Sequence, residues 1–178
     1  QQDPTSNFQW EFILVDDDQT KNAWCMPGGK IAFYSGILPI AKNEDGIASI
    51  MGHEIAHAVA RHSAERASTA MLTDFGIMAL EKFVLGQRLP QASGYVRQFG
   101  LDLPFNRKQE TEADYLGIIF SSLAGYNIEE SYKVWERMKE EGGSGPAEFW
   151  STHPSPDNRI KKLKEWIPIV SRQYPAIG

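Results

Sequence analysis

The sequence contains a single cysteine, Cys25, among its 178 residues. An intrachain disulfide is therefore excluded, and so is a zinc module held by four cysteines. Because secreted and cytosolic proteins alike can lack disulfides, the cysteine count leaves the cellular compartment open. Basic residues are also in deficit, since 18 Lys and Arg stand against 23 Asp and Glu, for a formal net charge of -5. This balance argues against a nucleic-acid-binding protein.

Long uninterrupted apolar runs are missing as well. A membrane-spanning helix needs about 18 such residues, and the best candidate, Phe75 to Leu85, is interrupted by Glu81 and Lys82. The first residues, QQDP, contain neither an initiator Met nor the basic and apolar regions of a signal peptide. We therefore expect no membrane span, and we interpret the chain as a processed or shortened form that could have lost an export signal.

The composition is that of one folded domain. Hydrophobic residues make up 42% of the chain and charged residues 23%, as is usual for soluble globular proteins. A chain of 178 residues is long enough to bury one sizeable core. We therefore expect residues 1–178 to form a single domain.

The N-terminal part of the chain has the pattern of β-strands. Apolar and polar residues alternate from Phe8 to Val15, which predicts a half-buried strand. Two further extended pieces, Lys21 to Met26 and Lys30 to Tyr34, flank the segment PGG, which is a strong signal for a hairpin turn. These segments predict a small antiparallel sheet.

From Asp45 onward the apolar residues follow a helical period. Two helix starts carry a capping signal, an asparagine followed three residues later by Gln or Glu. The pattern occurs at Asn106 and at Asn127. The predicted helices cover about Gly46 to Arg66, Thr69 to Leu85, Arg107 to Ala124, Asn127 to Glu141 and Ser155 to Trp166, with a long loop from Gly86 to Pro104. A small sheet packed on mainly helical structure is an α+β fold.

Residues 53–57, with the sequence HEIAH, carry the strongest functional signal. A four-residue step on an α-helix brings two side chains back within roughly 40° of each other, so His53 and His57 can bind one metal ion. Glu54 lies at the edge of that face, where its carboxylate can act as general base on a metal-bound water. Two of the four histidines of the chain lie here among small and apolar residues, which favours a metal site over a chance match.

A catalytic zinc ion normally has three protein ligands and one water, so a third ligand is required. Glu110 and Asp114 share one face of a predicted helix because they are four residues apart, whereas Glu112 points away. We expect Glu110 to bind the metal and Asp114 to accept a hydrogen bond from the far ring nitrogen of a liganding histidine. The alternative is a solvated acidic helix start, which would explain Glu110 and Glu112 without any ligand.

The two remaining histidines have different expected roles. His62 follows His57 by five residues, about 140° round a continuous helix, so it cannot bind the same ion and is expected to pack or to form a hydrogen bond. His153 lies in the Pro-rich turn THPSP. From these residues alone, a histidine in a surface loop is the simpler interpretation.

Four sequence blocks together resemble one family of zinc peptidases. NAWCMPGG, HEIAH, ETEADYLG and THPSPDNR occur in this order, and the last three are similar to the signatures HExxH, ExEADxxG and HPxxxxR. The family is the gluzincin family of HtpX, the CAAX prenyl proteases and the soluble BepA-type and Oma-type quality-control proteases. The resemblance extends from about residue 20 to residue 165, and it implies a gluzincin-type metallopeptidase fold.

The resemblance implies one zinc ion per chain, bound by His53, His57 and Glu110, with Glu54 as general base. It also implies a role for His153, either as donor to the tetrahedral oxyanion or as occupant of the open zinc position at rest. Arg159 is expected to hold the loop of His153 in place rather than to contact substrate. The lack of spanning segments favours the soluble branch, so we expect a periplasmic or cell-envelope location, with peripheral membrane association left open.

We therefore expect a zinc metalloendopeptidase that acts on unfolded or misassembled polypeptides in protein quality control. An exposed strand of the hairpin, Ala23 to Met26 or Ile31 to Tyr34, could pair with an extended peptide, and the loop from Gly86 to Pro104 could control access. Two alternatives stay open: a zinc aminopeptidase on the same ligands, and a binding or chaperone-like module whose metal site is held closed by His153. The aromatic residues expected to serve packing are Trp135, Phe149, Trp150 and Trp166.

Overall fold

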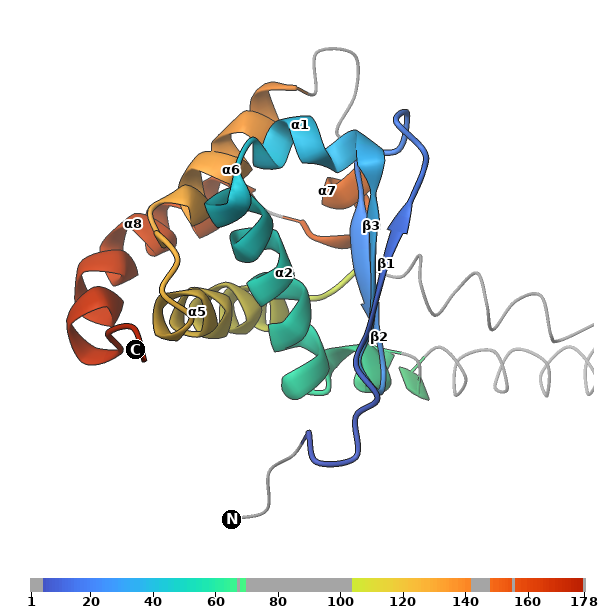
Figure 1. Cartoon of the computed structure of the whole chain (residues 1–178), viewed down its shortest axis with the longest axis horizontal. Helices are drawn as coiled ribbons and strands as arrows, with labels where there is room; N and C mark the ends of the chain where they lie inside the picture. Colours follow the sequence, from blue (N-terminus) through green and yellow to red (C-terminus); the bar gives the residue numbers. More distant parts are fainter. Residues whose placement is uncertain (1–4, 67, 70–103, 142–147, 155, 178) are drawn as a thin grey trace, which may run out of the picture.

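The computed structural model describes residues 5–66, 68–69, 104–141, 148–154 and 156–177. Its elements are β1 (Glu11–Val15), β2 (Ala23–Met26), β3 (Lys30–Tyr34), η1 (Ser35–Ile37), α1 (Leu38–Ala41), α2 (Glu44–Val59), α5 (Arg107–Leu123), α6 (Glu130–Glu140), α7 (Glu148–Thr152) and α8 (Pro156–Gln173). The small sheet stands at one side of the helices (Figure 1), which confirms the expected α+β fold. Apart from Thr69 and Pro104, the predicted helix up to Leu85 and the loop that follows it lie outside the described residues.

The sheet has the strand order β1-β3-β2. The predicted hairpin is present, because β2 and β3 pair antiparallel and the turn between them has positive φ at Gly28 (89°) and Gly29 (96°). β1 pairs with β3 in parallel, so the expectation of a purely antiparallel sheet is wrong. β3 is the central strand of the sheet. It runs antiparallel to β2 across the hairpin turn and in the same direction as β1 on its other side.

β1 lacks the buried face that its alternating sequence predicts. Phe12 is 55% exposed and Leu14 61%, while Ile13 on the opposite side is 44% exposed. β1 is an edge strand, so within the described part of the chain only β3 pairs with it. The sheet contributes to the hydrophobic core through the other two strands, whose buried side chains are Ala23, Cys25, Ile31, Ala32 and Phe33.

α2 begins at a capping residue and ends earlier than predicted. The side chain of Asn43 accepts a hydrogen bond from Gly46 N at 2.8 Å, which satisfies one backbone donor of the first turn. The helix ends at Val59 instead of continuing to Arg66, because the backbone at Arg61 is left-handed, with a φ of 61°. The chain changes direction there before a second helical stretch at residues 62–66.

The later helices follow their predicted order with two differences at their ends. α5 begins with the predicted capping box of Asn106 and Gln109. α6 lacks the predicted box, because the side chain of Asn127 accepts a hydrogen bond from Glu129 N instead. α8 continues past the predicted end at Trp166. Among the helices described, none combines the length and the apolar character needed to cross a membrane.

α2 and α5 cross in close contact at a pair of glycines. A Cβ atom at Gly52 would lie 2.8 Å from Gly117 O, and one at Gly117 would lie 2.9 Å from His53 N. Such short distances leave no room for a side chain at either position. The crossing therefore sets how closely the histidines of α2 approach the carboxylates of α5.

The substitution Gly117→Ala is expected to destabilise the protein even though alanine is the better helix former. The gain in helix propensity is about 1 kcal/mol, whereas overpacking a tight contact costs about 1–3 kcal/mol. We expect a net loss of roughly 1 kcal/mol in the free energy of unfolding, measured by urea denaturation. The exposed substitution Lys108→Ala on the same helix is the control and should leave this value nearly unchanged. A Gly117→Ala protein as stable as the wild type would contradict the close crossing.

Candidate metal centre

Two buried histidines one helical turn apart form the first part of the centre. His53 and His57 on α2 are 1% and 0% exposed, and their Nε2 atoms lie 3.0 Å from each other. The α-helix ends two residues after His57, so both side chains fall on one regular helical face. The structure therefore brings this pair together as the four-residue spacing predicts.

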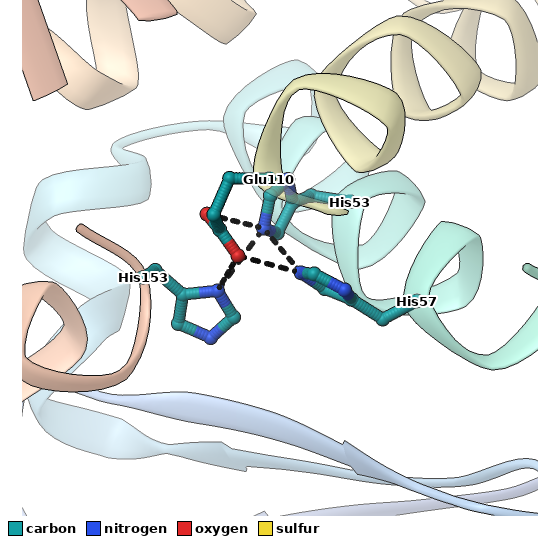
Figure 2. Close-up of side chains that lie close together, drawn as sticks. All are labelled: His53, His57, Glu110 and His153. Carbon is teal, nitrogen blue, oxygen red and sulfur yellow. Dashed lines mark hydrogen bonds and ion pairs between the residues drawn. The ribbon is translucent and has the colours of Figure 1, made fainter. Parts of the chain in front are cut away.

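Glu110 and His153 complete a cluster of four side chains. Glu110 Oε1 on α5 lies 3.0 Å from His57 Nε2, and it lies 3.0 Å from Nδ1 of His153, which follows α7. His53 Nε2 lies 3.2 Å from the same nitrogen of His153. Figure 2 shows the four side chains pointing at one another, and one ligand atom of each lies within 4.8 Å of all the others.

The nitrogen and oxygen atoms at the middle of the cluster fit a tetrahedral metal ion. Zinc bonds of about 2.0–2.1 Å imply a separation of roughly 3.3 Å between the ligand atoms of a tetrahedron. The separations of 3.0 and 3.2 Å from His53 Nε2 to His57 Nε2 and His153 Nδ1 are close to this value. Burial lowers the pKa of His57 well below its usual value and lowers the pKa of His153 to about 4, so both rings are neutral and can offer a lone pair.

Asp114 contacts His53 from the same face of α5 as Glu110. Asp114 Oδ1 lies 3.0 Å from His53 Nδ1, so this carboxylate accepts the proton of Nδ1 and leaves the lone pair of Nε2 directed at the cluster. With the proton of each ring on Nδ1, the lone pairs of His53 and His57 would face each other at 3.0 Å unless a cation lay between them. The donor set therefore fits a metal ion better than it fits direct hydrogen bonds.

Arg159 on α8 joins the two carboxylates of α5. Its Nε and Nη2 atoms donate to Asp114 at 2.6 and 2.8 Å, and its Nη1 atom lies 2.5 Å from Glu110 Oε2. Nη1 also donates to the carbonyl oxygen of His153 at 3.0 Å, so Arg159 holds the loop of that histidine. Burial alone would raise the pKa values of Glu110 and Asp114, but the charge of Arg159 lowers both pKa values below their ordinary range.

Glu54 lies beside the cluster and its carboxylate has an unsatisfied oxygen. The residue is 1% exposed, and its Oε1 atom accepts no hydrogen bond from the described residues, although His153 Nε2 lies 3.4 Å away. Burial raises the pKa of Glu54 well above its usual value, and the nearby charge of Glu110 raises this pKa further. This oxygen is therefore available to accept a proton.

A cavity of about 280 Å³ opens next to Glu54 and His153. β2 forms one wall of this cavity through Trp24 and Cys25. The remaining lining residues are Asn22, Tyr34, Arg66, Phe105, Ser151 and Thr152. Its volume is close to the lower end of the range that ligand pockets span.

Three aromatic rings do more than fill the core. Phe149 stacks on His153 with ring centroids 4.1 Å apart, and Trp135 Nε1 donates to Asp114 Oδ1 at 3.3 Å. Phe105 stacks on His57 at 3.8 Å. The sequence interpretation gave Phe105 no role, and no local signal in the sequence marks it as a partner of His57.

The structure departs from the sequence interpretation most clearly at His62. Its Nδ1 atom lies 3.1 Å from His57 Nδ1, and its Nε2 atom lies 3.2 Å from Glu112 Oε2. The expectation of a hydrogen bond is confirmed, but the angular argument behind it is wrong because the helix breaks at Arg61. Glu112, expected to point away from the site, is instead linked to it through His62.

Comparison with known proteins connects this geometry to one peptidase family. The family model described as "Peptidase family M48" matches residues 2–167. The "Mitochondrial metalloendopeptidase OMA1" of Schizosaccharomyces pombe is 45% identical over 92% of this chain and 48% of its own length. The protein of the same name from Saccharomyces cerevisiae is 38% identical over 93% of this chain and 49% of its own length. The "Beta-barrel assembly-enhancing protease" of Escherichia coli is 30% identical over 85% of this chain and 33% of its own length.

These relatives confirm the resemblance seen in the sequence blocks and correct one expectation drawn from it. The chain spans about half or less of the length of these curated relatives. The two relatives with the higher identities of 45% and 38% are both named as mitochondrial proteins. The expected periplasmic or cell-envelope location is therefore contradicted.

Replacing Arg159 by methionine is expected to destabilise the protein strongly, because Asp114 and Glu110 would lose their buried cationic partner. Breaking a buried ion pair by removal of one partner costs about 3–5 kcal/mol. Urea denaturation of the Arg159→Met protein should show a loss of this size. The matched control Lys164→Met removes the exposed pair with Glu136, which should cost less than about 1 kcal/mol. Equal losses for both substitutions would contradict the structural role of Arg159.

Proposed function

The chain belongs to peptidase family M48, and from this premise we propose that it is a zinc-dependent metalloendopeptidase that hydrolyses unfolded or misassembled polypeptides. The observation that carries the proposal is the buried cluster of His53, His57 and Glu110 beside the unsatisfied carboxylate of Glu54. We treat residues 1–178 as a single peptidase domain, in line with the family match to residues 2–167.

In the proposed centre His53, His57 and Glu110 hold one zinc ion per chain. The two imidazole rings and the carboxylate offer two nitrogen ligands and one oxygen ligand, a set that zinc peptidases use. A bound zinc ion would supply the Lewis acid that activates a water molecule and polarises the scissile carbonyl. Asp114 and Arg159 keep the ligands in place, Asp114 by accepting from His53 Nδ1 and Arg159 by pairing with both carboxylates.

Glu54 is the proposed general base. Its Oε1 atom has no other hydrogen bond among the described residues, so it can take a proton from a water molecule in the site and return that proton to the leaving amine. Burial raises the pKa of Glu54, which strengthens its hold on the proton that it must later deliver to the leaving amine.

His153 is the proposed occupant of the fourth position in a resting state. Its Nδ1 atom lies 3.0 Å from Glu110 Oε1 and 3.2 Å from His53 Nε2, which supports a place at the fourth vertex of the tetrahedron. Productive binding would then require His153 to leave this position, and its Nε2 side, near Glu54, faces the cavity where a substrate carbonyl would lie. The sequence also offers a second role for His153, as hydrogen-bond donor to the oxyanion. His153 could take that role only after it had left the fourth position.

The proposed substrate-binding element is β2, an edge strand of the sheet in the described part of the chain, on which Ser63 Oγ already occupies the carbonyl oxygen of Cys25. β3 is the central strand, which excludes Ile31 to Tyr34 as an edge and leaves Ala23–Met26 as the strand of the hairpin that can pair with a peptide. Trp24 and Cys25 of this strand line the same cavity as Glu54. Pairing through backbone groups tolerates many sequences, as a protease for misfolded proteins requires.

The relatives also guide the proposed biological setting. Two of them carry the name mitochondrial metalloendopeptidase, and one from Escherichia coli is named for enhancing β-barrel assembly. We place this chain among mitochondrial peptidases of protein quality control. An aminopeptidase is less well supported, because Glu54 is the only acidic residue among the described residues that line the cavity, and a free amine would need further carboxylates.

One observation favours a second function, a binding or chaperone-like module with a closed metal site. His153 completes four protein ligands around the proposed ion and would exclude water from it. A protein of this kind would bind unfolded clients and zinc without cleaving them. Proteolysis by the wild type therefore separates the two functions.

The substitution Glu54→Gln should abolish proteolysis while zinc stays bound. Loss of a general base lowers kcat by about 10²–10⁴-fold, which can be measured with an unfolded, fluorescently labelled protein substrate. Zinc content by elemental analysis should remain near one ion per chain, since Glu54 is not among the ligands. Glu136→Gln, an exposed change of the same kind, is the control. Undiminished cleavage by the Glu54→Gln protein would refute the mechanism.

The substitution His153→Ala should raise the basal cleavage of a short unstructured peptide several-fold, because the fourth position would no longer be filled by the protein. Zinc titration and thermal unfolding of the same variant would show that the centre and the fold are retained. A fall in kcat of about 10²–10³-fold would instead identify His153 as a donor to the oxyanion, and it would contradict the resting-state role.

A further inference from the structure

A chain of hydrogen bonds leads from His57 to the protein surface. His57 Nδ1 faces His62 Nδ1 at 3.1 Å, and His62 Nε2 faces Glu112 Oε2 at 3.2 Å. His57 and His62 are 0% and 3% exposed, whereas the side chain of Glu112 is 51% exposed. The chain therefore begins at the buried cluster and ends in solvent.

The positions of the protons along this chain follow from its outer end. A carboxylate oxygen only accepts hydrogen bonds, so His62 must carry a proton on Nε2 to pair with Glu112. With that proton on Nε2, Nδ1 of His62 is the acceptor of the inner pair and takes the hydrogen bond from Nδ1–H of His57. With its proton on Nδ1, His57 directs the lone pair of Nε2 at the cluster.

We propose that His62 and Glu112 are positioning residues that hold His57 in the tautomer required for binding a metal ion. This inference rests on the proposed function, in which His57 is a ligand. The opposite tautomer of His57 would direct an N–H group at the cluster, where it would repel a cation. The proposed pair thus acts on the metal through His57 and does not contact substrate.

The backbone at Arg61 makes this arrangement possible. On a continuous helix His62 would lie about 140° away from His57, but the left-handed φ of 61° at Arg61 turns the following residues back toward α2. The Oγ atom of Ser63 donates to Cys25 O at 3.0 Å and fastens the turn to β2. The turn at Arg61 therefore connects His62 to α2, and Ser63 connects it to β2.

The two histidines of α2 are supported in different ways. The Nδ1 atom of His53 pairs directly with a buried carboxylate, Asp114, which Arg159 also contacts. The Nδ1 atom of His57 pairs with the imidazole ring of His62, and the carboxylate of Glu112 lies on the far side of that ring, at the surface. The site already contains three buried carboxylates, those of Glu54, Glu110 and Asp114. Because Glu112 lies at the surface, the support of His57 does not bury another one.

The test compares two substitutions of His62 that differ in one hydrogen bond. His62→Phe keeps the ring volume but has no acceptor for His57 Nδ1–H, whereas His62→Asn places a carbonyl oxygen close to the former Nδ1 position. Loss of a supporting partner of this type lowers metal affinity by about 10–100-fold. We expect such a loss for His62→Phe, measured by competition with a zinc chelator of known affinity, and recovery of most of it in His62→Asn. The visible spectrum of the cobalt-substituted proteins should shift in His62→Phe alone.

Glu112 provides an independent arm with a matched control. Glu112→Leu should weaken zinc binding in the same direction but less than His62→Phe, because the carboxylate is half exposed. Glu136→Leu, which removes an exposed glutamate paired with Lys164 far from the cluster, should leave zinc affinity unchanged. Thermal unfolding of the chelated proteins reports whether each variant is folded.

Three outcomes would overturn the proposal in distinguishable ways. A folded His62→Phe protein that binds zinc as tightly as the wild type would show that His57 needs no such partner. Equal weakening in His62→Phe and His62→Asn would assign His62 a packing role. A wild-type protein that binds no zinc would refute the proposed function itself, and the positioning role with it.

Discussion

The guanidinium group of Arg159 is the charge on which the centre depends. It reaches Asp114, Glu110 and the carbonyl of His153 from α8, while it is itself 3% exposed. Buried carboxylates are tolerated only when they are paired, and here one arginine serves two of them. Helices α5 and α8 are thereby tied together at the point where the chemistry is proposed to occur.

Two glutamates a few ångströms apart have pKa values shifted in opposite directions. Arg159 lowers the pKa of Glu110, which keeps this side chain charged and able to bind a cation. Burial and the charge of Glu110 raise the pKa of Glu54, which suits a group that must gain and release a proton. The proposed division of roles between ligand and base thus follows from which carboxylate the arginine contacts. Neither role can be read from the identity of the residue alone.

The sequence predicted those parts of the centre that depend on local spacing. The pairs His53–His57 and Glu110–Asp114 lie one helical turn apart, so their common faces follow from helix geometry. The parallel pairing of β1 and the exposed Phe12 could not be predicted, because strand order depends on contacts between distant segments. The partner of His57 was missed because no local signal marks Arg61, which is not a glycine, as left-handed.

The separation of the site residues along the chain has a consequence for newly made copies of this protein. His53 contacts His153 and Arg159 across 100 and 106 residues of sequence. No fragment or partly folded chain that lacks either end can contain the assembled cluster, whatever secondary structure it has formed. The proposed peptidase activity would therefore appear only after the chain has reached its complete tertiary structure. Nascent chains of such an enzyme could not attack their neighbours before they had folded themselves.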